Sequence, residues 1–204
     1  MAEQIFPTKG NLINVKKSLA LSRLGYELMD RKRNILIREM MTLIDTAKSI
    51  RGSIESTYSE AYEALQEANI TLGIVEKFAK AVPVENGIVI SYRSVMGVEI
   101  PQITLEKSKL SLSYGFCDTN SHLDRAFICF AKVKELTVIL AEVENSIYRL
   151  ATAIKKTQRR ANALKNILIP KFEGIAKYIS DSLEEKERED FSRLKVIKLQ
   201  KKNS

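Results

Sequence analysis

Few side chains in this 204-residue sequence have types and spacings suited to chemistry. The chain has one histidine, His122, and two cysteines, Cys117 and Cys129, too few soft or imidazole ligands for an ordinary structural zinc site. His122 lies close to Asp124 at the expected start of a helix, so we expect it to cap the helix or to lie at the surface. Cys129 is expected to be a small core residue, Cys117 an ordinary loop thiol, and both are expected to stay reduced, as in the cytoplasm.

The common phosphate-binding and metal-binding motifs are absent from the sequence. There is no GxxxxGK[ST] loop, no GxGxxG turn after a strand, no HExxH pair and no Cys-x-x-Cys. Acidic residues gather in SLEEKERED at 182–190, but such closely spaced mixed charges fit an exposed helical turn better than a metal or regulatory site. Since no nucleophile or metal set accompanies the histidine, we predict a chain that is not an enzyme and has no catalytic, cofactor or metal site.

Basic side chains are the more prominent candidates for binding. The chain has 33 Lys and Arg against 25 Asp and Glu, which favours an acidic partner such as nucleic acid, anionic lipid or an acidic protein surface. Segment 8–51 holds 10 basic and 4 acidic residues, and segment 149–177 holds 8 and 1, whereas 52–80 and 121–148 are mildly acidic. Like charges clustered in this way repel one another unless a complementary surface covers them.

The first third of the chain has the pattern of one long helix. Residues 11–81 include no proline and only three glycines. From Leu12, steps of three and four residues in alternation meet apolar residues at sixteen of twenty positions, a 3.5-residue repeat that predicts a left-handed coiled coil. Small residues in this seam predict a neck where two helices approach closely: Ala61, Ala64 and Ala68.

A second seam follows in the last third of the chain. The same steps from Ala126 to Leu168 meet apolar residues at twelve of thirteen positions, Thr157 being the exception. Pro170 has no N–H to donate to the carbonyl of Asn166, so we expect the helix to kink or end there and then to resume. The chain closes with a basic tail, RLKVIKLQKKNS.

Between the two seams, β-branched residues cluster around turn signals. We predict a small β-hairpin with Gly97 in or beside its turn, and Pro101 confines its strand to an edge. The predicted organisation is an N-terminal long helix at 1–81, a middle region with the hairpin at 82–120, and a C-terminal long helix with a kink and tail at 121–204. The fold class is mainly α, a long antiparallel two-helix left-handed coiled coil.

Three segments resemble a known family. PTKGNLINVKKSLALSRLGYELMDRKRNIL near the start, VMGVEIP in the middle and TQRRANALKNILIPKFEGIAKYI late in the chain are similar to the D subunit, the central rotor stalk, of the V-type (vacuolar or archaeal-type) ATPases. Gly10 and Lys165 depart from the family pattern, and Lys165 puts a local salt bridge in doubt. The family motif is carried by Pro7, Thr8, Lys9, Asn162, Ala163, Leu164 and Pro170.

The resemblance implies a rotor shaft at the cytoplasmic face of a membrane. Its basic tip would enter the hexamer of catalytic and nucleotide-binding A and B subunits. The other end would bind the small F subunit and dock through the C subunit, called d in eukaryotes, onto the membrane ring, coupling ATP hydrolysis or synthesis to proton or sodium transport. Hexamer contacts are expected at Lys16, Lys17, Arg31, Arg33, Lys155, Lys156, Arg159 and Arg160. Contacts with the F subunit or the ring side are expected at Gly97, Val98, Pro101, Ala61, Ala64 and Ala68.

One alternative from another class remains open on the sequence, a basic coiled-coil scaffold that binds nucleic acid or an anionic membrane directly. Phosphate binding would weaken steeply with salt, and single-strand binding would favour exposed aromatic residues among the basic ones. The basic segments hold few aromatic residues, so we expect no nucleic-acid partner. No apolar run approaches the roughly 18 residues of a membrane span and the N-terminus lacks a signal pattern, so membrane contact is expected only through the complex.

Overall fold

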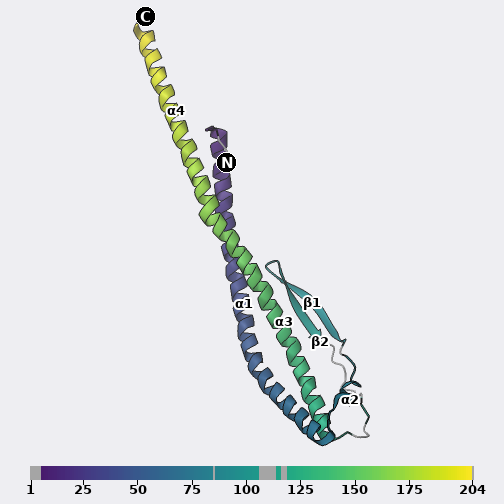
Figure 1. The fold of residues 1–204 in the computed structure, drawn as a ribbon. Helices are drawn as coiled ribbons and strands as arrows, with labels where there is room; N and C mark the ends of the chain where they lie inside the picture. The colour runs from purple at the N-terminus through teal and green to yellow at the C-terminus, as the bar shows by residue number, and fades with distance from the viewer. Residues whose placement is uncertain (1–5, 85, 106–113, 116–118, 204) are drawn as a thin grey trace. The chain divides into compact units, whose positions relative to one another are not determined.

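The computed structural model describes residues 6–84, 86–105, 114–115 and 119–203 (Figure 1). Most of them are helical, and the single described sheet is a two-stranded antiparallel hairpin. The mainly α fold with a hairpin in its middle is therefore confirmed. In chain order the elements are α1 (Lys9–Leu72), α2 (Glu76–Ala79), β1 (Ile88–Val95), β2 (Val98–Leu105), α3 (Ser121–Ala163), the π-helical turn η1 (Leu164–Leu168) and α4 (Ile169–Asn203).

The chain forms two compact units, and α1 and α3 contribute to both. The terminal unit consists of residues 1–34 and 155–204, and the connector unit consists of residues 35–154. Inside each unit, residue numbers rise along α1 as they fall along the partner helix, so the pairing is antiparallel. In the terminal unit the paired side chains are Lys9 with Glu187, Arg23 with Glu173 and Arg33 with Gln158. In the connector unit they are Arg51 with Glu144, Tyr58 with Thr137 and Arg125 with Glu67.

Burial follows the two predicted seams. Every predicted seam position on α1 and in the segment up to Phe78 is buried or half-buried except Thr71. On the second stripe only Leu168, 37% exposed, is classed as exposed. Because the positions between the seam residues are mostly exposed, the 3.5-residue repeat read from the sequence identifies the packing faces of both helices.

Helix α1 begins at an N-cap and ends at a glycine. The backbone N–H of Asn11 donates to Thr8 Oγ1 at 3.2 Å, which satisfies one of the unpaired donors of the first turn. Gly73 has a φ of 74°, a left-handed conformation that commonly terminates helices. The expectation of one helix up to residue 81 was therefore too long, because the chain turns at Gly73 before the short helix α2.

The predicted hairpin is confirmed, with Met96 and Gly97 as its two-residue turn. Val95 pairs with Val98, and φ is 51° at Met96 and 73° at Gly97. Two positive φ angles define the type I′ turn that suits the twist of a hairpin. Asparagine and glycine are usual at these positions, whereas a methionine at positive φ is strained.

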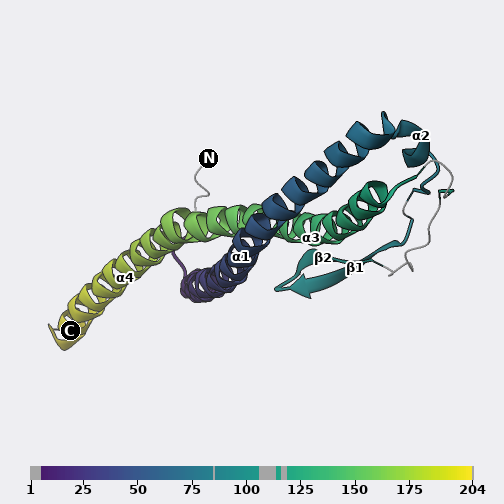
Figure 2. The ribbon, with the colours of Figure 1, turned by 90° about the horizontal axis from the view of Figure 1, so that it is seen from below.

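The hairpin packs into the core of the connector unit. Leu36 of α1, Ile100 of β2 and Leu150 of α3 form a buried cluster, so one core joins three elements. Seen from below in Figure 2, the hairpin lies along α3. A second buried cluster, formed by Ala68, Tyr114 and Leu123, holds the end of α1 against the start of α3.

The helix around Pro170 neither ends nor is interrupted. Instead, hydrogen bonding widens to a π-helical turn over Leu164–Leu168, where the N–H of Ile169 donates to the carbonyl of Leu164. A π-turn is one way for a helix to accommodate a residue that lacks an N–H. The sequence identified the site of the disturbance, but the helix absorbs it locally and continues as α4.

Candidate partner-binding surfaces

The terminal unit carries cationic side chains that have no anionic partner in the described part of the chain. Seven of the eight predicted tip residues are exposed. Among the residues that the structure describes, none of these seven has a carboxylate within ion-pair distance. They are Lys16, Lys17, Arg31, Lys155, Lys156, Arg159 and Arg160. The unit therefore presents uncompensated positive charge, which an acidic surface would stabilise.

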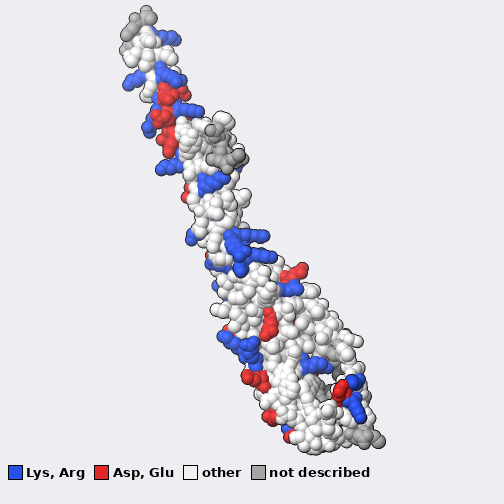
Figure 3. Space-filling view, in the orientation of Figure 1, with Lys and Arg blue, Asp and Glu red and all other residues white. Residues whose placement is uncertain are grey.

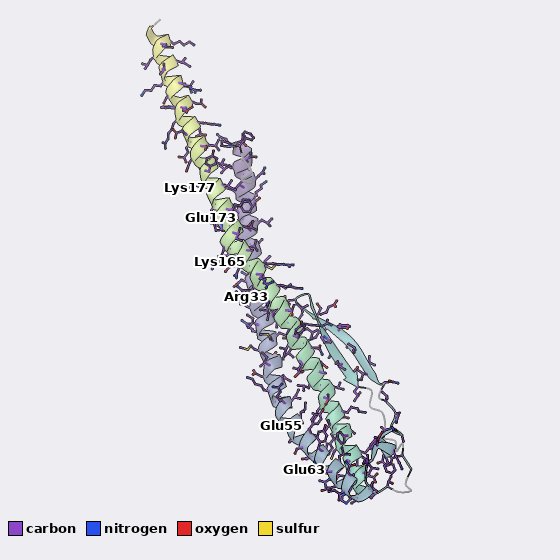
Figure 4. The ribbon with its side chains drawn as sticks, viewed as in Figure 1. Arg33, Glu55, Glu63, Lys165, Glu173 and Lys177 are labelled. Atoms are coloured by element: carbon purple, nitrogen blue, oxygen red, sulfur yellow. The ribbon has the colours of Figure 1, made fainter. Side chains whose placement is uncertain are left out.

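Arg33, the eighth predicted tip residue, is held inside the chain. Its guanidinium donates to Gln158 Oε1 at 2.8 Å and to Asn34 Oδ1 at 3.2 Å, and it lies 2.7 Å from Asp30 Oδ1. In Figure 4 it lies where α1 faces the partner helix. Since its side chain is 26% exposed, Arg33 bridges the seam and links the two helices of the terminal unit.

Helix α1 has a second apolar face in the terminal unit, which the seam pattern did not predict. Ile13, Leu21, Leu24 and Leu28 are 54%, 71%, 53% and 53% exposed. Their spacings of eight, three and four residues put them on one side of a helix. Because Ile13 and Leu24 each lie two residues before a seam position, about 200° around the helix, this outer stripe faces away from the seam. A search for apolar residues three or four positions apart on the face opposite the seam would have identified this stripe in the sequence.

The family-motif residues occupy structural positions in the terminal unit. Pro7 is half-buried and precedes the N-cap Thr8, and Lys9 lies 3.0 Å from Glu187. Asn162 Oδ1 accepts a hydrogen bond from Gln158 at 2.8 Å, which extends the network of Arg33. Leu164 reaches towards Gly25, while Ala163 is exposed and precedes the π-turn that accommodates Pro170.

Lys165, the noted departure from the family pattern, contacts an aromatic ring. Its Nζ lies 5.7 Å from the ring centroid of Tyr26, within the range of a cation–π interaction. Figure 4 labels Lys165 at the π-turn and Glu173 further along α4. At this position, where we expected an acidic residue, the lysine therefore interacts with an aromatic ring.

The last part of α4 extends beyond the start of α1 within the terminal unit (Figure 1). The acidic cluster is an exposed helical surface, as predicted, with ion pairs between Arg188 and Glu184 and between Arg193 and Glu189. Figure 3 shows these red and blue side chains interleaved along the helix. Beyond the cluster, Phe191 and Leu194 are 70% and 65% exposed, so this end also carries uncovered apolar surface.

The alanine neck is a feature of the connector seam. Ala61, Ala64 and Ala68 are 0%, 1% and 0% exposed, so their methyl groups are enclosed within the connector unit and cannot reach another protein. A partner at this level would instead contact exposed neighbouring residues such as Tyr62 and Glu63, the latter labelled in Figure 4. The ring of Tyr62 makes an edge contact with that of Phe130, with 5.7 Å between the ring centroids.

At the hairpin, the predicted residues differ in accessibility. Gly97 is exposed in the turn, Val98 is half-buried against the core, and Pro101 is buried. One edge of β2 is bonded to side chains of α3, a contact that the sequence did not indicate. Glu142 Oε2 accepts from the N–H of Ile103 at 2.9 Å. Ser146 donates to the carbonyl of Pro101 and Arg149 to the carbonyl of Glu99.

At the far end of the connector unit, polar residues join the two helices. Asn120 caps α3 through the N–H of Leu123, so His122 is not the cap. His122 Nδ1 instead lies 3.2 Å from Glu67 Oε2, and Arg125 is 3.3 Å from the same atom. Burial and the nearby carboxylate of Asp124 raise the pKa of Tyr114 to about 12, and its hydroxyl donates to that carboxylate at 2.7 Å.

Neither metal ligation nor a membrane span has a basis in the described residues. They include no group of three or more His, Cys, Asp or Glu side chains placed to hold a metal ion. In the same part of the chain no helix combines the length and the apolar character of a membrane-spanning segment. Cys129 is a free thiol half-buried in the seam, and Cys117 lies outside the described residues.

Comparison with known proteins gives this arrangement a family. Residues 11–199 match the family model for the ATP synthase D subunit. The chain belongs to the D-subunit family of ATP synthases. It is 45% identical over 196 residues to the V-type ATP synthase D subunit of Thermotoga neapolitana, covering 95% of this chain and 97% of that protein.

Two archaeal members of the D-subunit family are also similar over most of the chain. The A-type ATP synthase D subunit of Methanobrevibacter smithii is 40% identical over 199 residues, 95% of this chain and 86% of the relative. That of Thermococcus kodakarensis is 37% identical over 205 residues, 97% of this chain and 96% of the relative. The resemblance noted in the sequence is therefore confirmed, and it extends through both helices and the hairpin.

Proposed function

We propose that this chain is the central rotor shaft of a V-type or A-type ATP synthase. It hydrolyses no nucleotide itself. It couples ATP hydrolysis or synthesis in a hexamer of A and B subunits to rotation of a membrane ring, and so to proton or sodium transport. Relatives named as V-type and A-type D subunits support this function. The shaft belongs to a peripheral sector at the cytoplasmic face, and it contacts the membrane only through other subunits.

The outer apolar stripe of α1 carries the proposal. A two-helix rod needs one apolar face per helix, and the seam already uses it. On the side away from the seam, the apolar side chains of Leu21, Leu24 and Leu28 are exposed to solvent. Since such surface generally marks an interaction site, the terminal unit is the part of the shaft that another protein encloses.

The uncompensated positive charge of the terminal unit indicates the charge of the surface that encloses it. The seven exposed cations, Arg159 and Arg160 among them, have no carboxylate partner in the described chain. We infer that they face acidic loops of the hexamer. Ion pairs between exposed side chains contribute only about 0.2–1 kcal/mol each, so contacts of this kind can break and reform as the shaft turns.

The connector unit is the end that meets the other stalk proteins. We propose that the F subunit and the C subunit, or its eukaryotic counterpart d, bind here, near Gly97 and the exposed side chains beside the alanine neck. The long helices within segments 1–81 and 121–204 then form the two arms of the shaft, and segment 82–120 provides the docking element. The covered edge of β2 makes the hairpin a rigid extension of α3.

Stoichiometry tests the assignment. A tagged full-length chain should be purified from its own cells together with the A and B subunits. The assembly should contain one copy of the tagged chain, three copies of the A subunit and three copies of the B subunit. Recovery as a lone protein, or with nucleic acid or lipid in place of these subunits, would contradict the proposal. In the latter case, binding that weakens steeply with salt would support the scaffold alternative.

Charge reversal tests the acidic contact. The double variant Arg159→Glu with Arg160→Glu should fold normally, because both side chains are exposed, and should lower assembly or ATP-driven rotation. Its matched control reverses two exposed lysines of the connector unit, Lys77→Glu with Lys132→Glu, and should leave hexamer binding intact. Wild-type assembly and wild-type ATP-driven rotation in the arginine variant would refute the contact between these arginines and acidic loops of the hexamer.

A further inference from the structure

Among the described residues, the hairpin has one covered edge and one open edge. Side chains of α3 at spacings of four and three residues, Glu142, Ser146 and Arg149, bond the outward N–H or carbonyl groups of β2. These bonds satisfy backbone groups that an edge strand otherwise leaves unpaired. In Figure 1, β1 is the strand further from α3, so its outer edge is the open one.

The register identifies which groups of β1 are open. Val95 and Val98 close the two-residue turn as a hydrogen-bonded pair, and bonded pairs alternate along an antiparallel ladder. The N–H and C=O groups that point away from β2 therefore belong to alternate residues. Within the described chain no hydrogen bond reaches these outward backbone groups. The four residues are Ile88, Ile90, Tyr92 and Ser94.

The same residues present an apolar face. Ile88, Ile90 and Tyr92 are 46%, 55% and 59% exposed, and their side chains share one side of the strand because side chains alternate along it. The strand contains no proline, lysine or acidic residue, the usual means by which an edge resists pairing. Its one charged residue, Arg93, is paired with Glu39 at 2.6 Å. An eight-residue edge whose outward residues carry this apolar face is suited to accept another strand.

One charge beside this face limits what can bind. The guanidinium of Arg149 lies 5.4 Å from the ring centroid of Tyr92 and donates to the carbonyl of Glu99 at 3.2 Å. Arg149 is exposed and has no carboxylate partner among the described residues. A second copy of this chain pairing through β1 would bring no carboxylate, since β1 contains none. Charge complementarity thus favours a different protein with an acidic residue.

We propose that β1 accepts an extended segment of another protein of the complex as a third strand. The segment has apolar side chains at alternate positions, which lie over Ile88 and Ile90, and an acidic residue that pairs with Arg149. This inference deepens the proposed function, on which it rests, by naming the chemistry of the partner that docks at the connector unit. The paired strand would fix that partner rigidly to the shaft.

Residue-resolved amide hydrogen exchange tests the pairing in the assembly that the tagged chain brings down. The amides of Ile88, Ile90, Tyr92 and Ser94 should exchange at least about tenfold more slowly in the assembly than in the isolated chain. Their neighbours, which already bond β2, should change little. Unchanged exchange at the four outward amides would overturn the inference, as would protection that appears in the isolated chain at raised concentration, because self-pairing would then be the occupant.

Matched variants test the face and the charge. Ile90→Lys should reduce retention of the docked partner at least about fivefold. Val89→Lys, which adds the same charge to the opposite side of the same strand at a residue 47% exposed, should not. Arg149→Glu should reduce retention and Arg149→Lys should largely preserve it. Equal effects of Ile90→Lys and Val89→Lys would overturn the inference.

The two proposals fail in different ways. Absence of the A and B subunits from the purified assembly would overturn the rotor function. Their presence at the expected ratio, with fast exchange at the four outward amides, would overturn only the strand pairing.

Discussion

Truncating Leu150 tests whether the hairpin and both long helices of the connector unit share one core. Leu150 is 0% exposed and packs with Leu36 and Ile100. Leu150→Ala removes three carbons, worth about 2.4 kcal/mol at roughly 0.8 kcal/mol per buried methylene. The cavity left behind adds to this loss, because the surrounding side chains belong to three different elements and can fill the cavity only partly. We therefore expect the free energy of unfolding to fall by about 3–4 kcal/mol in total.

The measurement is urea unfolding of the full-length chain, followed by circular dichroism. The control is Ile139→Ala on the same helix, where the side chain is 44% exposed, and it should cost less than about 1 kcal/mol. A loss at Leu150 as small as the loss at Ile139 would refute the shared core. The rigid attachment of the hairpin, on which its proposed docking role depends, would be refuted with it.

Three further substitutions have defined outcomes. Met96→Asn should raise the free energy of unfolding by about 0.5–1 kcal/mol, since asparagine tolerates the positive φ of 51° better; lower stability in urea would contradict the turn. Gly52→Ala should add about 0.5–1 kcal/mol, because a Cβ there meets nothing within 4 Å; thermal unfolding should show a higher Tm. The raised pKa of Tyr114 stabilises the fold below about pH 10, and this contribution falls away as pH rises from about 10 to about 12. Tyr114→Phe should flatten that part of the pH–stability curve, and an unchanged slope would argue against the buried hydroxyl.

The helices and their packing faces could be predicted from sequence because one repeat specifies both. A 3.5-residue period places Leu36 and Leu150 on facing seams whatever the rest of the helix contains. The hairpin was also predictable, since β-branched runs around Gly97 favour strands and a turn. The end of α1 at Gly73 was missed because a glycine within a helical pattern is often tolerated, and only its φ shows that it ends the helix.

The binding surfaces were less predictable because they depend on which charges find partners inside the chain. Arg33 and Arg31 lie two positions apart, yet Arg33 bonds Gln158 across the seam while Arg31 stays exposed. The covered edge of β2 needs Glu142 and Arg149 to meet a strand some forty to fifty residues earlier in the chain. Such long-range pairings have no periodic signal in the sequence.

The central claim, that this chain is the turning shaft of its complex, is tested most directly by observing rotation. The A and B subunits would be fixed to a surface and a bead attached to the chain through a cysteine introduced at Ile70, 83% exposed, with Cys117 and Cys129 replaced by alanine. Adding ATP should turn the bead continuously in one direction, with three pauses in each revolution. A bead that stays still or only fluctuates while the same complexes hydrolyse ATP would contradict the claim.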